Sequence, residues 1–177
     1  PDYFIRFSLS PTGVSEDDFL RHNFVRQVHL SKSFERTLWI GTSIGLKKIT
    51  YSATDSETID YQTFSYQKGQ ENGLSHGFVA DVLETDDGRY IWVATYDGLN
   101  ILDTQTQEFR RFHSVKQSGT LLSNIVKALF IDRSGVLWVG TEKGLNKINL
   151  AARPFRNIQF PVENNIISCV TNAKDRS

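Results

Sequence analysis

The sequence predicts an all-β fold, a β-propeller segment of about three complete four-stranded blades with partial blades at both ends. The prediction depends on three near-copies of one phrase, at residues 38–46, 91–99 and 137–145. Each copy places a tryptophan among aliphatic residues and follows it with a turn glycine and a leucine. The tryptophans are 53 and then 46 residues apart, the length of one blade and too long for a coiled coil or a leucine-rich repeat. Propellers support catalysts, receptors and adaptors, so the fold class alone leaves the function open.

Four strands are expected in every copy. The first strands are the apolar-alternating stretches upstream of each tryptophan, 24–28, 78–82 and 125–129. Polar connectors such as Asp86-Asp87-Gly88 lead into the tryptophan strands, and their glycines supply the positive φ of a tight hairpin. The third strands follow turn glycines, at 46–49, 99–102 and 145–148. The fourth strands carry apolar residues three apart: Tyr61 and Phe64, Phe109 and Phe112, Phe155 and Ile158.

The repeat phase also predicts the boundaries of the units. These are a partial blade at 1–20, blades at 21–66, 74–113 and 121–160, and a partial blade at 165–177. Residues 4–7 resemble a fourth strand, and residues 165–170 resemble a first strand. Closed propellers usually have four to eight blades, so three blades and two fragments indicate part of a longer repeat array. We expect its uncovered end sheets to be covered by the remaining blades of a longer parent chain, or by self-association such as a homodimer.

Composition excludes several classes of partner. The chain has 20 basic and 20 acidic residues, so no net charge attracts it to nucleic acid or to a membrane surface. The longest apolar runs have strand length, so we expect no membrane insertion of this segment. Its first residues carry no targeting signal, and a single cysteine excludes an internal disulfide.

Residues that invite a chemical interpretation have simpler structural roles. We expect the tryptophans Trp39, Trp92 and Trp138 to be core between blades, each with an indole N–H partner, and the small residues two positions later to let sheets approach. The Gly-Thr-x-x-Gly runs lack the remainder of a phosphate loop, and Asp86 and Asp87 fit a turn. Cys169 shares a repeat position with Phe24, Phe78 and Ile125, which predicts a buried thiol.

No catalytic residue, metal site or cofactor is predicted. The four histidines form no metal-binding spacing, and no serine lies in a Gly-x-Ser-x-Gly elbow. We therefore expect a protein that is not an enzyme. The enzyme alternative stays open at this point, because propeller enzymes often collect catalytic residues from several blades at the central channel.

The repeat resembles the two-component regulator propeller repeat. The third copy matches best, from Leu122-Ser123-Asn124-Ile125-Val126 through Asp132, Gly135 and Trp138-Val139-Gly140-Thr141 to Gly144-Leu145-Asn146. The second copy has Ala94 in place of the glycine, and the first is looser, with Lys47 where the others have asparagine. The resemblance implies the periplasmic sensor part of a membrane-bound hybrid histidine kinase, as in gut Bacteroidetes, where ligands are often breakdown products of polysaccharides.

Geometry indicates where a ligand would bind. In a propeller blade, the connector into the first strand and the turn between the second and third strands emerge on the same face. At matching positions on that face the three copies differ chemically, as a recognition surface would, and as exposed loops without function would too. The ligand-binding candidates are His22, Asn23, His76, Tyr96, Asp97, Ser123, Asn124, Glu142 and Lys143.

The sequence thus predicts an extracytoplasmic sensing segment that responds to an oligosaccharide ligand. Two alternatives remain, a propeller enzyme that acts on polysaccharides, such as a lyase or an esterase, and a protein-binding scaffold.

Overall fold

A computed structural model describes residues 8–10, 13, 15–52, 59–115, 120–150 and 155–158. Within this part of the chain, one short helix precedes twelve strands. The elements are α1 (Glu16–Asn23), β1 (Val25–Leu30), β2 (Thr37–Thr42), β3 (Leu46–Tyr51), β4 (Ile59–Phe64), β5 (Val79–Glu84), β6 (Tyr90–Thr95), β7 (Gly98–Asp103), β8 (Glu108–Phe112), β9 (Val126–Ile131), β10 (Val136–Thr141), β11 (Gly144–Asn149) and β12 (Phe155–Ile158). None of the helices in these described ranges is long and apolar enough to cross a membrane.

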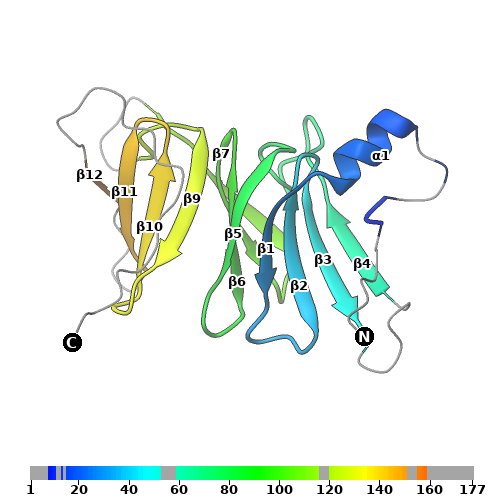
Figure 1. Ribbon diagram of the computed structural model, residues 1–177. Coiled ribbons are helices and arrows are strands. Elements are labelled where there is room, and N and C mark those ends of the chain that lie inside the picture. Colours follow the sequence, from blue (N-terminus) through cyan, green and yellow to red (C-terminus); the bar gives the residue numbers. More distant parts are fainter. Residues whose placement is uncertain are drawn as a thin grey trace, which may run out of the picture.

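The strands form three antiparallel four-stranded sheets, each made of four consecutive strands in sequence order. We call them blade 1 (β1–β4), blade 2 (β5–β8) and blade 3 (β9–β12). Figure 1 shows the three sheets side by side, with the first strands β1, β5 and β9 at the centre of the arc, where β1 contacts β5 and β5 contacts β9. This arrangement confirms the expected β-propeller segment. The sheets fall within the ranges 21–66, 74–113 and 121–160, whereas residues 4–7 and 165–170 lie outside the described residues.

The three tryptophans occupy one place in the repeat, as predicted. Each lies in the second strand of its sheet, where Trp39 pairs with His29 and Lys48 on the neighbouring strands. In blade 2 the partners of Trp92 are Leu83 and Ile101, and in blade 3 those of Trp138 are Phe130 and Lys147. The same register in three sheets makes every other position directly comparable between blades.

The core between blades 1 and 2 is built from opposite faces of two sheets. Trp39 and Leu46 of blade 1 pack against an aliphatic face of blade 2 that includes Val79, Val82 and Leu102. Phe64 stacks on Trp39 at a centroid distance of 6.3 Å, and Phe109 of blade 2 meets Phe64 edge-on at 5.7 Å. Burial of this apolar area is the main stabilising contribution at the interface, on the order of 25 cal/mol per Å².

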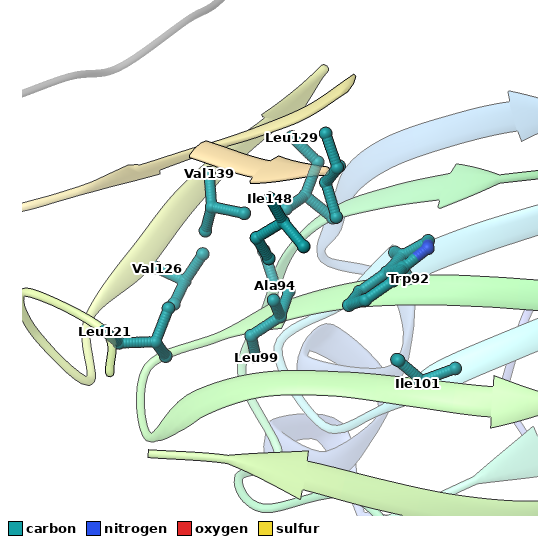
Figure 2. Close-up of a cluster of buried hydrophobic side chains, with 10 residues drawn as sticks. Trp92, Ala94, Leu99, Ile101, Leu121, Val126, Leu129, Val139 and Ile148 are labelled. Atoms are coloured by element: carbon teal, nitrogen blue, oxygen red, sulfur yellow. The ribbon is translucent and has the colours of Figure 1, made fainter. Parts of the chain in front are cut away.

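The core between blades 2 and 3 repeats this pattern. Figure 2 shows Trp92 and Ile101 of blade 2 facing Leu129, Val139 and Ile148 of blade 3. Phe112 stacks on Trp92 at 6.2 Å, as Phe64 does on Trp39. Trp39 and Trp92 therefore each pack against the blade that follows their own in sequence.

The burial expected for the tryptophans holds for two of them only. Trp39 and Trp92 are 1% and 6% exposed, whereas Trp138 is half-buried. Trp138 lies on the face of blade 3 that points away from blade 2, where the described residues include no further blade. The expectation of an indole N–H partner is also wrong for the buried pair. Among the described residues, Nε1 of Trp39 and of Trp92 has no acceptor, whereas Nε1 of Trp138 donates to Asp132 Oδ2 at 2.8 Å.

The predicted turn glycines adopt the conformations that the turns require. Gly88 and Gly135 have φ values of +68° and +76° in the hairpins between the first and second strands. The corresponding hairpin of blade 1 has no glycine, and there Arg36 takes a positive φ of +51°. The small residue after the tryptophan has the packing role that we expected, because a Cβ on Gly41 would lie 2.9 Å from Val79 Cγ1.

Helix α1 is a feature that the repeat did not predict. It occupies residues that we assigned to a partial blade and to the entry of blade 1. Acidic residues in its first turn and Arg21 and His22 in its last turn suit the helix dipole. The insertion also displaces the repeat: Leu20 stands five residues before Val25, as Leu74 does before Val79, but it is exposed, and Leu9 packs against Ile40 and Ile49 instead.

Candidate functional site

The connectors into the first strands and the turns between second and third strands meet on one face, which we call the loop face. It is the upper edge of the sheets in Figure 1, on the side of α1. Backbone hydrogen bonds join the two sets of segments: Tyr96 N donates to Phe78 O at 3.3 Å, and Glu142 N donates to Ile125 O at 3.1 Å. Gly98 N donates to Asn124 O of blade 3 at 2.7 Å, which links two blades on this face. These connectors and turns, which are distant in sequence, therefore form one continuous surface.

Four rings line up on this face at blade 2, and we call them the aromatic row: Tyr66, His76, Tyr96 and Phe78. The His76 ring stacks with Tyr66 and with Tyr96, each at a centroid distance of 6.4 Å, and Phe78 approaches Tyr96 at 4.2 Å. Tyr66 and Tyr96 are 42% and 38% exposed. Large rings that stay in solvent on a packed fold are typical of a binding surface.

Local hydrogen bonds hold the row in place. Nδ1 of His76 accepts the backbone N–H of Phe78 at 2.9 Å, which fixes the imidazole orientation. Thr95 Oγ1 donates to Gly98 O at 2.8 Å and accepts from Asp97 N at 3.3 Å, so the turn that carries Tyr96 is braced from inside. The equivalent Thr42 and Thr141 make the same bonds, which explains the Gly-Thr-x-x-Gly pattern as turn chemistry.

Asp97 connects the row to blade 3. Its Oδ1 accepts from Asn124 Nδ2 at 3.2 Å, and its Oδ2 lies 4.0 Å from His113 Nε2. Asn124 is itself fixed, because its Oδ1 accepts the backbone N–H of Ser114 at 2.6 Å. Half of the Asp97 side chain remains exposed, so the carboxylate can still accept a hydrogen bond from outside.

The blade 3 candidates form a separate pair. Ser123 is buried and donates to Glu142 Oε1 at 2.8 Å, while its Oγ accepts the backbone N–H of Ile125 at 3.1 Å. Lys143 beside them is exposed. Ser123 therefore supports the connector, whereas Glu142 and the neighbouring Lys143 can reach solvent.

The blade 1 candidates stand at the end of α1 and serve the fold. Asn23 accepts the backbone N–H of Leu9 at 2.8 Å and donates to Ser10 Oγ at 2.7 Å. His22 Nδ1 lies 3.5 Å from Nζ of Lys47, a buried lysine that also donates to Thr63 Oγ1. Burial lowers the pKa of Lys47. Lys47 takes the register position of Asn100 and Asn146, which tie down the connectors of their blades.

The structure thus brings together some of the predicted site residues and adds others. His76 meets Tyr96, Asp97 meets Asn124, and Ser123 meets Glu142. His22 lies beside Lys47, and Asn23 bonds to Leu9 and Ser10. Sequence reasoning missed Tyr66, Phe78, His113 and Arg26. The sequence signal that could have indicated this site is the cluster of aromatic residues on either side of β5.

The position shared by Phe24, Phe78 and Ile125 explains why Phe78 was missed. We predicted a buried position, but Phe24 is 52% exposed and the other two are half-buried. This removes the reason for expecting a buried thiol at Cys169, which lies outside the described residues. The residue at this position stands just before the first strand, at the loop face, and not between the sheets.

Carboxylates on the opposite face have turn roles, as predicted. Asp87 Oδ1 accepts from Thr85 Oγ1 at 2.6 Å and from Arg89 N at 3.1 Å, and these hydrogen bonds lower its pKa. Asp132 accepts from Ser134 and Trp138 side chains and from backbone N–H groups, which lower its pKa to about 2. Such carboxylates stay ionised at neutral pH and are poor general acids.

Two carboxylates, the buried Glu84 and the half-buried Asp81, join neighbouring blades. Glu84 of blade 2 accepts from Ser31 Oγ and Lys32 N of blade 1, each at 2.9 Å. His29 Nε2 lies 3.6 Å from Glu84, and burial lowers the pKa of this histidine. Asp81 accepts the backbone N–H of Leu129 of blade 3 at 2.7 Å, and burial raises its pKa. Both carboxylates are occupied by structural hydrogen bonds.

A cavity of about 660 Å³ lies between the outer parts of blades 2 and 3, and its lining includes Trp92, Phe112 and Ile148. The matching place between blades 1 and 2 holds Phe109, which packs against Phe64. Phe109 pairs with Leu102, and the residue that pairs with the equivalent Ile148 is Phe155. The cavity thus lies beside a strand pairing that the repeat places in every blade. Nor does any group of acidic, histidine or cysteine side chains in the described ranges have the arrangement of a metal site.

Comparison with known proteins agrees with this architecture. Residues 120–143 match the family model described as "Two component regulator propeller", which confirms the resemblance inferred from the third repeat. No curated protein matches the chain.

Solved structures show the same fold. One is the extracellular domain of a protein described as a hybrid two component system, BT3049 from B. thetaiotaomicron, with 22% identity and a TM-score of 0.65 over 77% of this chain and 18% of that domain. A second is the corresponding domain of BT4673 from B. thetaiotaomicron, with 20% identity and a TM-score of 0.63 over 85% of this chain and 19% of that one. The WD40 propeller of Doa1 is also similar, with 14% identity and a TM-score of 0.60 over 83% of this chain and 44% of that one. The chain spans about a fifth of the two extracellular domains, and at these identities the likeness establishes the fold.

Proposed function

We propose that this chain is part of the extracytoplasmic, periplasmic sensor of a two-component receptor, and that its loop face binds an oligosaccharide derived from a polysaccharide. The observation that carries the proposal is the aromatic row with Asp97 beside it, exposed on a surface assembled from two blades. The match of residues 120–143 to the two-component regulator propeller family supports the sensor role. So do the extracellular domains of the two B. thetaiotaomicron proteins that share the fold.

The row has the chemistry that a sugar requires. A pyranose offers apolar C–H faces and a rim of hydroxyl groups, so it binds where aromatic rings lie next to a few fixed polar groups. Tyr66 and Tyr96 supply exposed rings, and the Asp97 carboxylate can accept hydrogen bonds from hydroxyl groups. The equivalent turns of blades 1 and 3 begin with Ser43 and Glu142, so the Tyr96 ring is specific to blade 2.

Signalling needs a difference in affinity between two receptor states. A ligand shifts such an equilibrium only by as much as it binds one state more tightly. Asp97 and Asn124 span blades 2 and 3, and Arg26 of blade 1 lies over Phe78 of blade 2. A ligand on the row therefore touches groups from adjacent blades, and it would favour one arrangement of those blades within a dimeric receptor.

Calorimetric titration of the chain with oligosaccharides tests this proposal. We expect saturable binding that is at least about tenfold weaker in Tyr96→Ala, since removal of one aromatic contact costs on the order of 1 to 2 kcal/mol. Tyr51→Ala is the matched control, because Tyr51 is similarly exposed but lies at the far end of β3. Absence of saccharide binding, or equal effects of the two variants, would overturn the proposal.

The same preparations separate the alternatives. Turnover of a polysaccharide that disappears in His76→Ala or Asp97→Ala would replace the sensor with an enzyme. Binding of a protein partner that is lost in Tyr96→Ala, without any saccharide binding, would replace it with a scaffold.

A further inference from the structure

The aromatic row ends in a cation. The guanidinium of Arg26, on β1 of blade 1, lies over the Phe78 ring of blade 2 at 5.3 Å from the ring centroid. It also lies 5.9 Å from the centroid of the Phe24 ring. Contacts of this kind fix the plane of a guanidinium while leaving its N–H groups free to donate at the edges.

Arg26 makes no ion pair within the described residues. The arginines that do pair, Arg36 with Glu35 and Arg89 with Asp103, are elsewhere on the molecule. The carboxylate closest to the row, Asp97, is directed to Asn124 and His113 on the blade 3 side. Arg26 is exposed, and the Phe24 and Phe78 rings orient its guanidinium. None of the carboxylates named above neutralises its charge.

The cation is also specific to one blade junction. Two residues after Phe24, Phe78 and Ile125, the equivalent position holds Arg26 in blade 1, Ala80 in blade 2 and Lys127 in blade 3. Among the described side chains at this position, only the arginine lies over a ring of the next blade. The cation and the row therefore coincide at the junction of blades 1 and 2.

We propose that Arg26 is the anion-binding end of this site, and that the oligosaccharide ligand carries a carboxylate or a sulfate on one of its sugar units. This inference rests on the proposed function, because it assigns the charge of the ligand that the aromatic row binds. A guanidinium presents two parallel N–H donors to a carboxylate or a sulfate, while the sugar ring of the same unit contacts Phe78 and Tyr96. Arginine and tyrosine also occur in protein interfaces, but such interfaces cover about 800 Å² on each partner, more than the four rings of the row and one guanidinium offer.

Titration with matched oligosaccharides tests the charge assignment. The probes are galactotriose, which is neutral, trigalacturonate, which carries carboxylates, and a sulfated galactose trisaccharide. We expect the acidic probes to bind at least about tenfold more tightly at low salt, since a charge-assisted hydrogen bond contributes on the order of 1.5 to 3 kcal/mol. The advantage should shrink as NaCl is added, because salt screens an exposed charge. The tighter of the two acidic probes identifies the anionic group.

Variants distinguish Arg26 from a general charge effect. Arg26→Ala should lower the affinity for acidic probes to that for galactotriose, and Arg26→Lys should restore only part of it, because lysine is a point charge. Arg110→Ala is the matched control: its guanidinium also lies over a ring, Tyr90, at 5.8 Å, but on the outer strand β8. This control should bind like the original chain.

The outcomes separate this inference from the proposed function. If all probes bind equally and Arg26→Ala changes nothing, the sensor site stands and the anionic ligand is wrong. If no probe binds, the saccharide ligand itself fails and the inference fails with it. If Arg26→Ala changes the sedimentation of the chain and not saccharide binding, the row is a protein contact and the inference is overturned.

Discussion

The face of blade 2 that packs against blade 1 can be compared directly with the equivalent face of blade 1. We call the latter the outer face of blade 1. Val79 and Val82 of blade 2 are 0% and 2% exposed, because Trp39 and Leu46 of blade 1 cover them. Val25 and Val28 hold the same register in blade 1 and are 44% and 52% exposed. Blades 1 and 2 therefore carry apolar residues at the same positions of one face, and that face is buried only where a neighbouring blade covers it.

The largest effect should come from the tryptophan that is covered. Trp92→Ala should lower the free energy of unfolding by about 3 to 5 kcal/mol, because a large ring leaves a packed core. The repeat alone predicts the same loss for Trp138→Ala, but Trp138 is half-buried, so a smaller loss is expected. Urea unfolding of both variants measures the difference. Equal losses would show that Trp138 is covered as well as Trp92.

A polar contact between blades should rank second. Glu84→Ala leaves the Ser31 hydroxyl and the Lys32 N–H without their acceptor, and we expect a loss of about 2 to 3 kcal/mol. Glu84→Leu, which copies Leu30 at the matching position of blade 1, tests whether apolar packing replaces the carboxylate. A loss below about 0.5 kcal/mol in the alanine variant would contradict a contribution of this contact.

The close approach of two sheets gives a third prediction. A methyl group on Gly41 would lie 2.9 Å from Val79 Cγ1 and 3.3 Å from Val79 O, so Gly41→Ala should cost about 1 to 2 kcal/mol. In Gly73→Ala the new methyl group has no neighbour closer than 3.7 Å, which makes this variant the control. Thermal unfolding of the pair compares them. Equal melting temperatures would mean that blades 1 and 2 can separate slightly at no cost.

The outer face of blade 1 should affect association more than stability. We propose that further blades of a parent receptor or another copy of the chain cover Val25 and Val28, and that the isolated chain self-associates at tens of micromolar. Val28→Lys should reduce that association with a change in unfolding free energy within about 0.5 kcal/mol, since Val28 already faces solvent. Sedimentation equilibrium measures it. An original chain that stays monomeric would refute the proposal.

Features that are local and repeat in every blade could be predicted from the sequence. The inserted helix and the contacts between blades could not. Trp92, Gly98 and Phe112 each follow from strand alternation or turn geometry within one blade, so their places were predictable. Leu20 lies within the inserted helix α1 and is exposed, whereas Leu9, which precedes the helix, packs against Ile40 and Ile49. No repeat spacing indicates an insertion of that kind. The contact of Arg26 with Phe78 joins residues 52 positions apart, so only the packed blades reveal it.

The smallest effect distinguishes Trp138 from the two buried tryptophans. Its indole N–H donates to Asp132, whose pKa of about 2 is depressed by hydrogen bonds from Ser134 first and Trp138 second. Because this pKa lies below the usual value of 3.8, the stabilisation from these bonds is complete above about pH 4 and is lost as the pH falls toward 2.

Nitrogen-resolved NMR of the three indole N–H groups measures this difference. The Trp138 signal should move as the pH falls from 5 toward 2, while those of Trp39 and Trp92, which have no acceptor among the described residues, stay in place. In Asp132→Asn the Trp138 signal should lose its pH dependence, because no carboxylate remains to be protonated. Acid unfolding would move all three signals together, so movement of Trp138 alone is the diagnostic result. A Trp138 signal that does not respond to pH in the folded chain would remove the hydrogen bond to Asp132 from this account.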